Sequence, residues 1–162
     1  MEKNTIKVGM ADLNVTKAPH LLTTLGLGSC VGITLYDEVN KIAGLAHIML
    51  PSSKEIKNNE NKAKFADTGI DELIKSMVKI GANKNYLVAK IAGGAQMFNF
   101  NSNNQMLKIG ERNIMATKEK LKELNIRIVS EDTGGNFGRT IVLDSADGSL
   151  YVRTIGHGEK II

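Results

Sequence analysis

Two residues of this chain could form a nucleophile and its base. Cys30 is the only cysteine among 162 residues, and His47 is one of three histidines. A thiol becomes a strong nucleophile when an imidazole close to it accepts or shares its proton. Such chemistry requires a fold that brings these two side chains together.

The segments around both residues predict a β-hairpin. Residues 31–36 alternate apolar and small or polar side chains, as a half-buried strand does, and residues 41–48 form a second apolar segment. Residues 37–40, Asp-Glu-Val-Asn, are typical of a turn between two strands.

The simplest register of this hairpin pairs Tyr36 with Lys41, which places Cys30 directly opposite His47. Opposed residues of an antiparallel pair have Cβ atoms about 4.5–5.5 Å apart, close enough for a thiol and an imidazole to share a proton. We therefore expect a Cys30–His47 pair in which the imidazolium holds the thiol as a thiolate.

Another interpretation is structural. A single cysteine is often a small buried apolar residue, and a histidine between Ala46 and Ile48 is often a core residue with satisfied hydrogen bonds. Gly26 and Gly28 favour the chemical interpretation, because glycines expose the backbone beside Cys30 where a space-filling cysteine would need bulky neighbours.

Other kinds of site find little support. Residues 25–29 resemble a phosphate loop but lack the third glycine and the Gly-Lys-Ser/Thr ending. The three histidines and Cys30 do not follow the spacing of metal ligands. We predict neither a metal nor a cofactor.

Composition indicates one globular domain over residues 1–162. The chain is too short for two comfortable domains, has no apolar segment near the roughly 20 residues that span a bilayer, and begins without a secretory signal. One cysteine excludes an internal disulfide and fits a cytoplasmic location. The net charge of +4 is scattered and aromatics are few, so nucleic-acid binding and membrane insertion are not expected.

The remaining pattern predicts an α+β fold. A helix is expected from an N-cap at Thr68 to a stop at Gly81, and a second over about 110–124. Their expected buried faces are Ile70, Leu73, Ile74, Met77 and Val78, and Ile114, Met115, Leu121 and Leu124. Further strands are expected over 6–8, 21–25 and 86–91, followed by three antiparallel strands over 126–131, 139–144 and 150–155. Residues 52–64 are polar, which favours a mobile surface loop beside the site.

Four segments together resemble the chemoreceptor glutamine deamidase family, CheD. They are Thr-Leu-Gly-Leu-Gly-Ser-Cys at 24–30, Ala-His-Ile-Met-Leu-Pro at 46–51, Ile-Ala-Gly-Gly-Ala-Gln-Met-Phe at 91–98 and Asp-Thr-Gly-Gly-Asn-Phe-Gly-Arg at 132–139. The resemblance implies a single-domain three-layer α/β/β fold with antiparallel sheets. It also implies that Cys30 is the nucleophile, His47 its base and Thr24 the third catalytic residue.

The expected reaction follows from this resemblance. Cys30 would attack the carboxamide of a glutamine in a methyl-accepting chemoreceptor, His47 would move protons, and Thr24 would orient the imidazole. The backbone amides around Gly28 and Ser29 are candidates for an oxyanion hole. The dyad alone would equally serve a transglutaminase or a cysteine protease; the resemblance implies water as the acceptor.

The resemblance also offers an alternative role, as a mainly non-catalytic partner and stimulator of the chemotaxis phosphatase CheC. Phe98 and Phe100 lie in a polar segment and could contact such a partner, since exposed aromatic pairs often mark interfaces. Both rings could equally well pack into the core.

Overall fold

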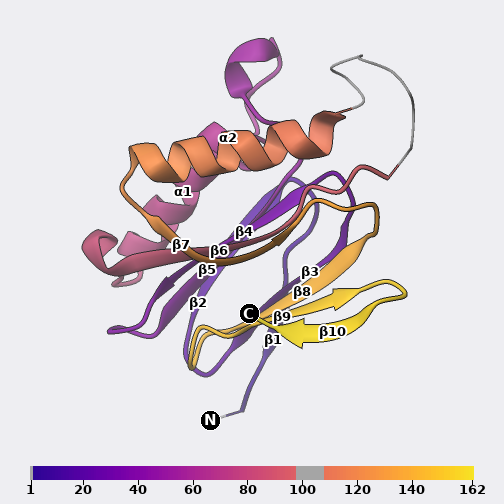
Figure 1. The fold of residues 1–162 in the computed structure, drawn as a ribbon. Coiled ribbons are helices and arrows are strands. Elements are labelled where there is room, and N and C mark those ends of the chain that lie inside the picture. Colours follow the sequence, from indigo (N-terminus) through magenta and orange to yellow (C-terminus); the bar gives the residue numbers. More distant parts are fainter. Residues whose placement is uncertain (1, 98–107) are drawn as a thin grey trace.

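Ten strands form two sheets in the computed structural model, which describes residues 2–97 and 108–162 (Figure 1). The helix-covered sheet has the order β2-β5-β4-β6-β7 and the outer sheet has the order β1-β3-β8-β9-β10. The strands of the helix-covered sheet are β2 (Asp12–Lys17), β4 (Val31–Asp37), β5 (Ile42–Ile48), β6 (Leu87–Gly93) and β7 (Arg127–Thr133). Those of the outer sheet are β1 (Thr5–Lys7), β3 (Leu21–Leu27), β8 (Arg139–Asp144), β9 (Leu150–Thr154) and β10 (Gly158–Ile161).

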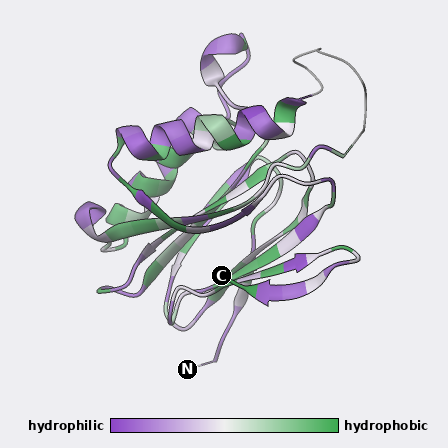
Figure 2. Cartoon of the chain, viewed as in Figure 1, coloured by the Kyte–Doolittle hydropathy of each residue, from purple (hydrophilic) through white to green (hydrophobic). Residues whose placement is uncertain are grey.

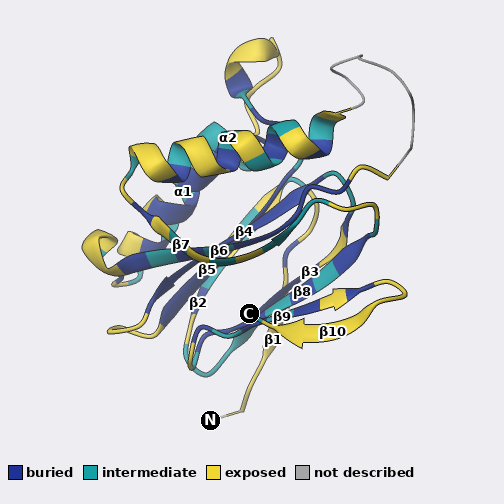
Figure 3. Ribbon diagram, in the orientation of Figure 1, coloured by how far each residue is buried: buried dark blue, intermediate teal, exposed yellow. Residues whose placement is uncertain are grey.

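Two longer helices, α1 (Ala66–Lys79) and α2 (Ile109–Glu123), lie on one face of the helix-covered sheet, and the outer sheet packs on its other face (Figure 1). Every residue of β4 and β5 is consequently buried, as Figure 3 shows for the middle of the molecule. A strand covered on both faces needs mostly small or apolar residues, which these two strands supply apart from a few polar ones such as Asp37 and His47 (Figure 2). The expected α+β class with α/β/β layers is confirmed.

The described residues form two apolar cores, one on each face of the helix-covered sheet. Ile33, Leu35, Ile70 and Leu73 belong to the core beneath the helices. The core between the sheets contains Leu22, Leu27, Cys30, Leu45, Ile141 and Val152. Cys30 therefore lies between the two sheets.

The sheets are mostly antiparallel, but β1 pairs with β3 and β6 with β7 in parallel. The prediction that residues 126–131 form an antiparallel group with the next two strands is wrong. α2 is a crossover between β6 and β7, and a crossover helix returns the chain parallel to the strand it left. β2 and β10, two edge strands, were not predicted. β10 is exposed throughout and shows little apolar pattern, whereas β2 does alternate, with Leu13 and Val15 between polar residues, and that signal was missed.

Both helices differ in detail from the prediction. α1 begins at Ala66 without a side-chain cap, so Thr68 lies within its first turn, and the chain leaves it through Gly81 at a φ of 115°. Val78 and Met115 are 46% and 62% exposed, so their assignment to the buried faces is wrong.

Residues 52–64 contain two short 3₁₀ turns, Ser53–Glu55 and Lys62–Lys64. The Ser53 backbone N–H and hydroxyl both donate to the Asp67 carboxylate, which fixes the start of this segment on α1. Within the described parts of the chain, no helix has the length and apolarity to span a membrane.

Candidate functional site

The hairpin of β4 and β5 forms with a different register from the predicted one. Asp37 pairs with Ile42, and Gly32 is the residue opposite His47. The Asp37 carboxylate explains the shift: it accepts hydrogen bonds from the Asn40 backbone N–H, the Asn40 side-chain amide and the Asn83 backbone N–H. Asp37 is thereby fixed as the last strand residue, and the predicted direct opposition of Cys30 and His47 is wrong.

The shift nevertheless leaves both side chains on one face, because the loop still has four residues and the partner of His47 moves by two positions, from Cys30 to Gly32. That face points to the outer sheet, since a Cβ on Gly32 would lie 2.6 Å from Ile141 Cδ1. Cys30 is therefore a diagonal neighbour of His47, and such neighbours lie about 7–8 Å apart between Cα atoms, with Cβ atoms somewhat closer.

His47 is held from the opposite sheet. Its Nδ1 lies 2.7 Å from Thr24 Oγ1 on β3, and the hydroxyl of Thr24 donates to the Val8 carbonyl oxygen at 2.7 Å. A hydroxyl has one hydrogen and a carbonyl can only accept, so the Thr24 proton is committed to Val8. Thr24 must then accept from the Nδ1–H of His47, which leaves Nε2 of the neutral ring unprotonated.

The Nε2 atom of His47 is buried and has no hydrogen-bond partner among the described residues. Because unpaired buried polar atoms cost free energy, one without a partner in a resting site marks a place where a substrate, a water or a proton can bind. Thr24 and His47 are each 1% exposed and Cys30 is 7% exposed, so the site is nearly closed.

Burial acts on the two reactive groups in opposite directions. It raises the pKa of the Cys30 thiol above its ordinary value, an effect that the Cys30 backbone N–H partly offsets. It lowers the pKa of the His47 imidazole. Both shifts favour neutral forms, opposite to the thiolate–imidazolium pair that the sequence suggested. In the resting site His47 is suited to act as a base that takes the thiol proton when the nucleophile attacks.

The segment before Cys30 is fixed by Gly93, the last residue of β6, and by the two residues that follow it. The Gly94 N–H donates to the Cys30 carbonyl oxygen at 2.8 Å, and the Ala95 N–H donates to that of Gly28 at 2.8 Å. A Cβ on Gly93 would lie 2.3 Å from the Cys30 carbonyl oxygen, so this contact requires glycine. Sequence motifs far apart in the chain thus meet around Cys30.

Of the predicted oxyanion donors, the Gly28 N–H is engaged with the Gly26 carbonyl oxygen at 3.1 Å. In residues 2–97 and 108–162, the backbone-to-backbone hydrogen bonds outside helices and strands include none donated by the Ser29 amide, whereas the Cys30 amide hydrogen-bonds the Cys30 thiol. The Ser29 amide, next to Cys30 in the chain, is therefore the stronger of the two candidates for an oxyanion donor.

Two residues of the site were not predicted. The Val8 carbonyl cannot be recognised from sequence, because any residue at that position supplies it. Asn113 of α2 is fully buried and donates to the carbonyl oxygens of Ser29 and Met49. Its signal was available: Asn113 shares the 3–4 spacing of the buried positions Gly110, Thr117 and Leu121.

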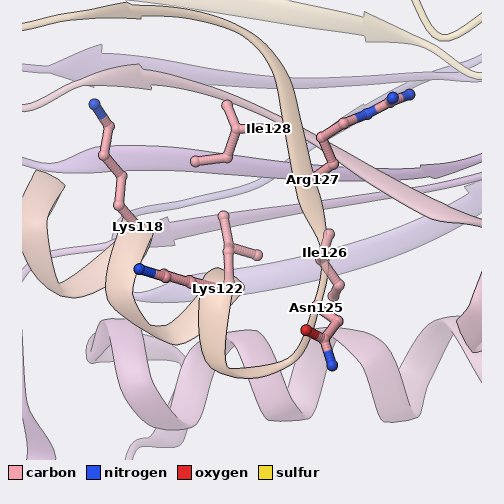
Figure 4. A pocket seen from close by; sticks show the side chains of 7 residues that line it. Lys118, Lys122, Asn125, Ile126, Arg127 and Ile128 are labelled. Carbon is pink, nitrogen blue, oxygen red and sulfur yellow. The ribbon is translucent and has the colours of Figure 1, made fainter.

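Neither the predicted partner contacts nor the hollow beside α2 contributes a described residue to the site around Cys30 and His47. Phe98 and Phe100 fall outside the described residues. A hollow of about 360 Å³ lies between the end of α2 and β7, with Lys118, Lys122 and Arg127 around Ile128 (Figure 4), and its lining includes none of Thr24, Cys30 or His47. The described residues contain no cluster of His, Cys, Asp or Glu suited to a metal ion.

The chain is similar to known proteins over its full length. The family model for CheD chemotactic sensory transduction matches residues 49–154. The chain is 62% identical over 162 residues, the full length of both chains, to the probable chemoreceptor glutamine deamidase CheD of Caldanaerobacter subterraneus subsp. tengcongensis. It is 55% identical to the chemoreceptor glutamine deamidase CheD of Halalkalibacterium halodurans, over 98% of this chain and 99% of the other.

Among solved structures, the crystal structure of the Bacillus licheniformis hypothetical protein YfiH is similar with a TM-score of 0.46 at 20% identity, over 75% of this chain and 50% of that one. The family match covers more than half of the chain, and the two curated relatives extend the similarity over Thr24, Cys30 and His47. The chain belongs to the CheD family.

Proposed function

We propose that this protein deamidates glutamine side chains of methyl-accepting chemoreceptors, with Cys30 as nucleophile, His47 as base and Thr24 as the residue that orients His47. The observation that carries the proposal is the chain of hydrogen bonds from His47 Nδ1 through Thr24 to the Val8 carbonyl. It leaves Nε2 as a free base on the face of the sheet that also carries Cys30.

The first half of the reaction forms a thioester. As Cys30 Sγ attacks the side-chain carbonyl carbon of the glutamine, its proton moves to His47 Nε2. The resulting tetrahedral intermediate carries an oxyanion, for which the Ser29 and Cys30 amides are the candidate donors. Nε2–H then protonates the leaving nitrogen, ammonia departs, and the acyl group remains on sulfur.

The second half releases glutamate. His47 Nε2, again unprotonated, takes a proton from water, which attacks the thioester carbon. The intermediate collapses with loss of the thiolate, which recovers its proton from Nε2–H. The balance is one water consumed and one ammonia released for each glutamine converted.

Burial suits this cycle. A thiol whose pKa is raised stays protonated and unreactive toward solvent, and an imidazole whose pKa is lowered stays available as a base. Nucleophile and base thus become charged together only when a substrate carbonyl can accept the new bond.

The substrate class comes from the relatives, whose names describe glutamine deamidases of chemoreceptors. Identity of 62% over the whole chain supports the same class here. The near-complete burial of the three residues suits a substrate such as a primary amide, which is a poor electrophile and needs an enclosed and preorganised site to react.

The test is incubation of the purified protein with a chemoreceptor cytoplasmic fragment, with glutamine-to-glutamate conversion followed by mass spectrometry and ammonia by an enzymatic assay. Cys30→Ala and His47→Gln should each abolish conversion while the protein remains folded. Conversion that persists in Cys30→Ala would refute the proposal. Incorporation of an added amine would indicate a transglutaminase, and a cleaved peptide bond a protease.

Binding to CheC is a separate prediction, since Phe98 and Phe100 fall outside the described residues. A binding measurement with Cys30→Ala, Phe98→Ala and Phe100→Ala tests it independently of catalysis. Loss of binding only in the phenylalanine variants would support the predicted contact, and unchanged binding in all three would place the partner surface elsewhere.

A further inference from the structure

We infer that Asn113 is a positioning residue that fixes the spacing between Cys30 and His47 by joining the ends of the two strands that carry them. The inference rests on the proposed function, because it assigns Asn113 a role in that same site. Asn113 is fully buried, and its Nδ2 donates to the Ser29 carbonyl oxygen at 2.9 Å and to the Met49 carbonyl oxygen at 3.0 Å.

The two carbonyls that Asn113 binds lie just beyond the paired ends of β4 and β5. The ladder between β4 and β5 ends at the pair Val31 and Ile48. Continued by one rung, it would pair Cys30 with Met49. The chain instead diverges there, with Met49 donating its N–H to the Lys64 carbonyl oxygen. Both hydrogens of the Asn113 amide thus span the gap where the strand pair opens, immediately beside the nucleophile.

The helix that carries Asn113 is itself seated on the backbone that holds Cys30. A Cβ on Gly110 would lie 2.4 Å from the Ala95 carbonyl oxygen and 2.7 Å from that of Gly94. Gly94 in turn donates to the Cys30 carbonyl oxygen. The close approach that Gly110 permits fixes the first turns of α2 against this backbone, so the Asn113 side chain has a defined position relative to Cys30.

An asparagine at this position is not explained by packing. Its Oδ1 has no hydrogen-bond partner among the described residues, so the side chain carries an unpaired polar atom in a buried place. A leucine has a similar branched shape, though a larger volume, and would carry no such unpaired atom. The two donated bonds to the strand ends are the compensating feature.

The same helix offers a matched control. Thr117, one turn further along α2, is also fully buried, and its hydroxyl also has no partner among the described residues. It makes no hydrogen bond to the strand ends. Replacing Thr117 therefore perturbs the same helix–sheet interface without touching the spacing of Cys30 and His47.

The experiment compares Asn113→Leu with Thr117→Val in the full chain. Three quantities are measured: the urea midpoint of unfolding, the rate of Cys30 alkylation against pH, and kcat and KM for deamidation of a receptor fragment. In Asn113→Leu we expect kcat to fall about 10- to 100-fold, as for a modest misplacement of reacting groups, with KM nearly unchanged. We also expect the alkylation midpoint to move toward that of an ordinary thiol, because the opened strand ends admit water to Cys30.

Thr117→Val should leave kcat and the alkylation profile as in the unaltered protein. An unchanged kcat and alkylation profile in folded Asn113→Leu would overturn the inference, as would equal changes in Thr117→Val. If Asn113→Leu does not fold, Asn113→Ala and Thr117→Ala are compared by the same measurements, since the smaller side chain strains nothing, and the same two outcomes decide.

Alkylation needs no substrate, so this arm is independent of the proposed reaction. If the unaltered protein deamidates no receptor, the proposed function fails while the alkylation comparison still supports or overturns the role of Asn113 in placing Cys30. If deamidation is normal and alkylation is insensitive to Asn113, only the further inference fails.

Discussion

Replacing Thr24 by valine is the sharpest single test of how the site works. Valine keeps the shape of threonine and removes the hydroxyl that lies between His47 Nδ1 and the Val8 carbonyl oxygen. Two buried polar groups lose their shared partner at once. The imidazole then has no bond that selects its tautomer, and a ring with its proton on Nε2 cannot act as the base for Cys30.

The size of the effect can be worked from these contacts. Leaving a buried hydrogen-bonding group unpaired costs about 1–3 kcal/mol. If the same free energy is lost from the transition state, kcat falls by about 5- to 150-fold, because each 1.36 kcal/mol is a factor of ten. Activity should be reduced and not abolished, since the nucleophile and base remain.

Thr23→Val is the matched control. The Thr23 hydroxyl is also buried and donates to the Ile141 carbonyl oxygen at 2.7 Å, the same distance as Thr24 to Val8. Both valine variants should lose stability against urea, Thr24→Val the more because its hydroxyl has two buried partners and that of Thr23 has one. Only Thr24→Val should lose kcat, and Thr24→Ser should recover much of it because the hydroxyl is restored.

Deamidation of a receptor fragment, followed by mass spectrometry over a time course, measures kcat for all three variants. Equal kcat in Thr24→Val and Thr23→Val would refute the reasoning, since the loss would then reflect general destabilisation. Unaltered activity in Thr24→Val would show that His47 is oriented by another group.

Three further outcomes are expected. Burial lowers the pKa of His47 below its ordinary 6.5, so below that pH the unfolded chain binds more protons than the folded one. The free energy of unfolding, measured by urea titration, should therefore fall as the pH drops from 6.5. His47→Gln should make this dependence on pH shallower. Because burial raises the pKa of Cys30, its alkylation rate should increase with pH, and the midpoint of this increase should lie at a higher pH than for an ordinary thiol. An alkylation rate that already reaches its plateau at mildly acidic pH would contradict this. Gly93→Ala should destabilise the fold and slow deamidation far more than Gly156→Ala. Both glycines have a positive φ, but only a Cβ at position 93 would clash with the Cys30 carbonyl oxygen. Similar losses in the two variants would mean that backbone strain alone is the cause.

The sequence was most informative where local pattern and turn chemistry act together. The hairpin was predictable because two strand-like segments, 31–36 and 41–48, are separated by a short polar segment that is typical of a turn. A four-residue loop keeps Cys30 and His47 on one face in either register. The register itself was not predictable, because it depends on Asn83, a residue distant in sequence that hydrogen-bonds the Asp37 carboxylate.

What sequence reasoning missed is mostly long-range. The place of β7 in the helix-covered sheet depends on α2 acting as a crossover, whereas the apolar pattern of 126–131 fits a parallel or an antiparallel strand equally. The Val8 carbonyl carries no side-chain signal. Asn113 had one, a polar residue at a buried helical position, but its partners Ser29 and Met49 appear only when the layers are assembled.

In the proposed mechanism the three layers have separate parts. The helix-covered sheet would carry the reacting groups, Cys30 and His47, at the end of one hairpin. The outer sheet would set the protonation of His47 through Thr24, and the helical layer would set the spacing through Asn113. Because no single layer completes the site, a mutation that loosens the packing between layers should reduce kcat before it unfolds the protein. The coupling runs through hydrogen bonds of 2.7 to 3.0 Å, which tolerate little displacement.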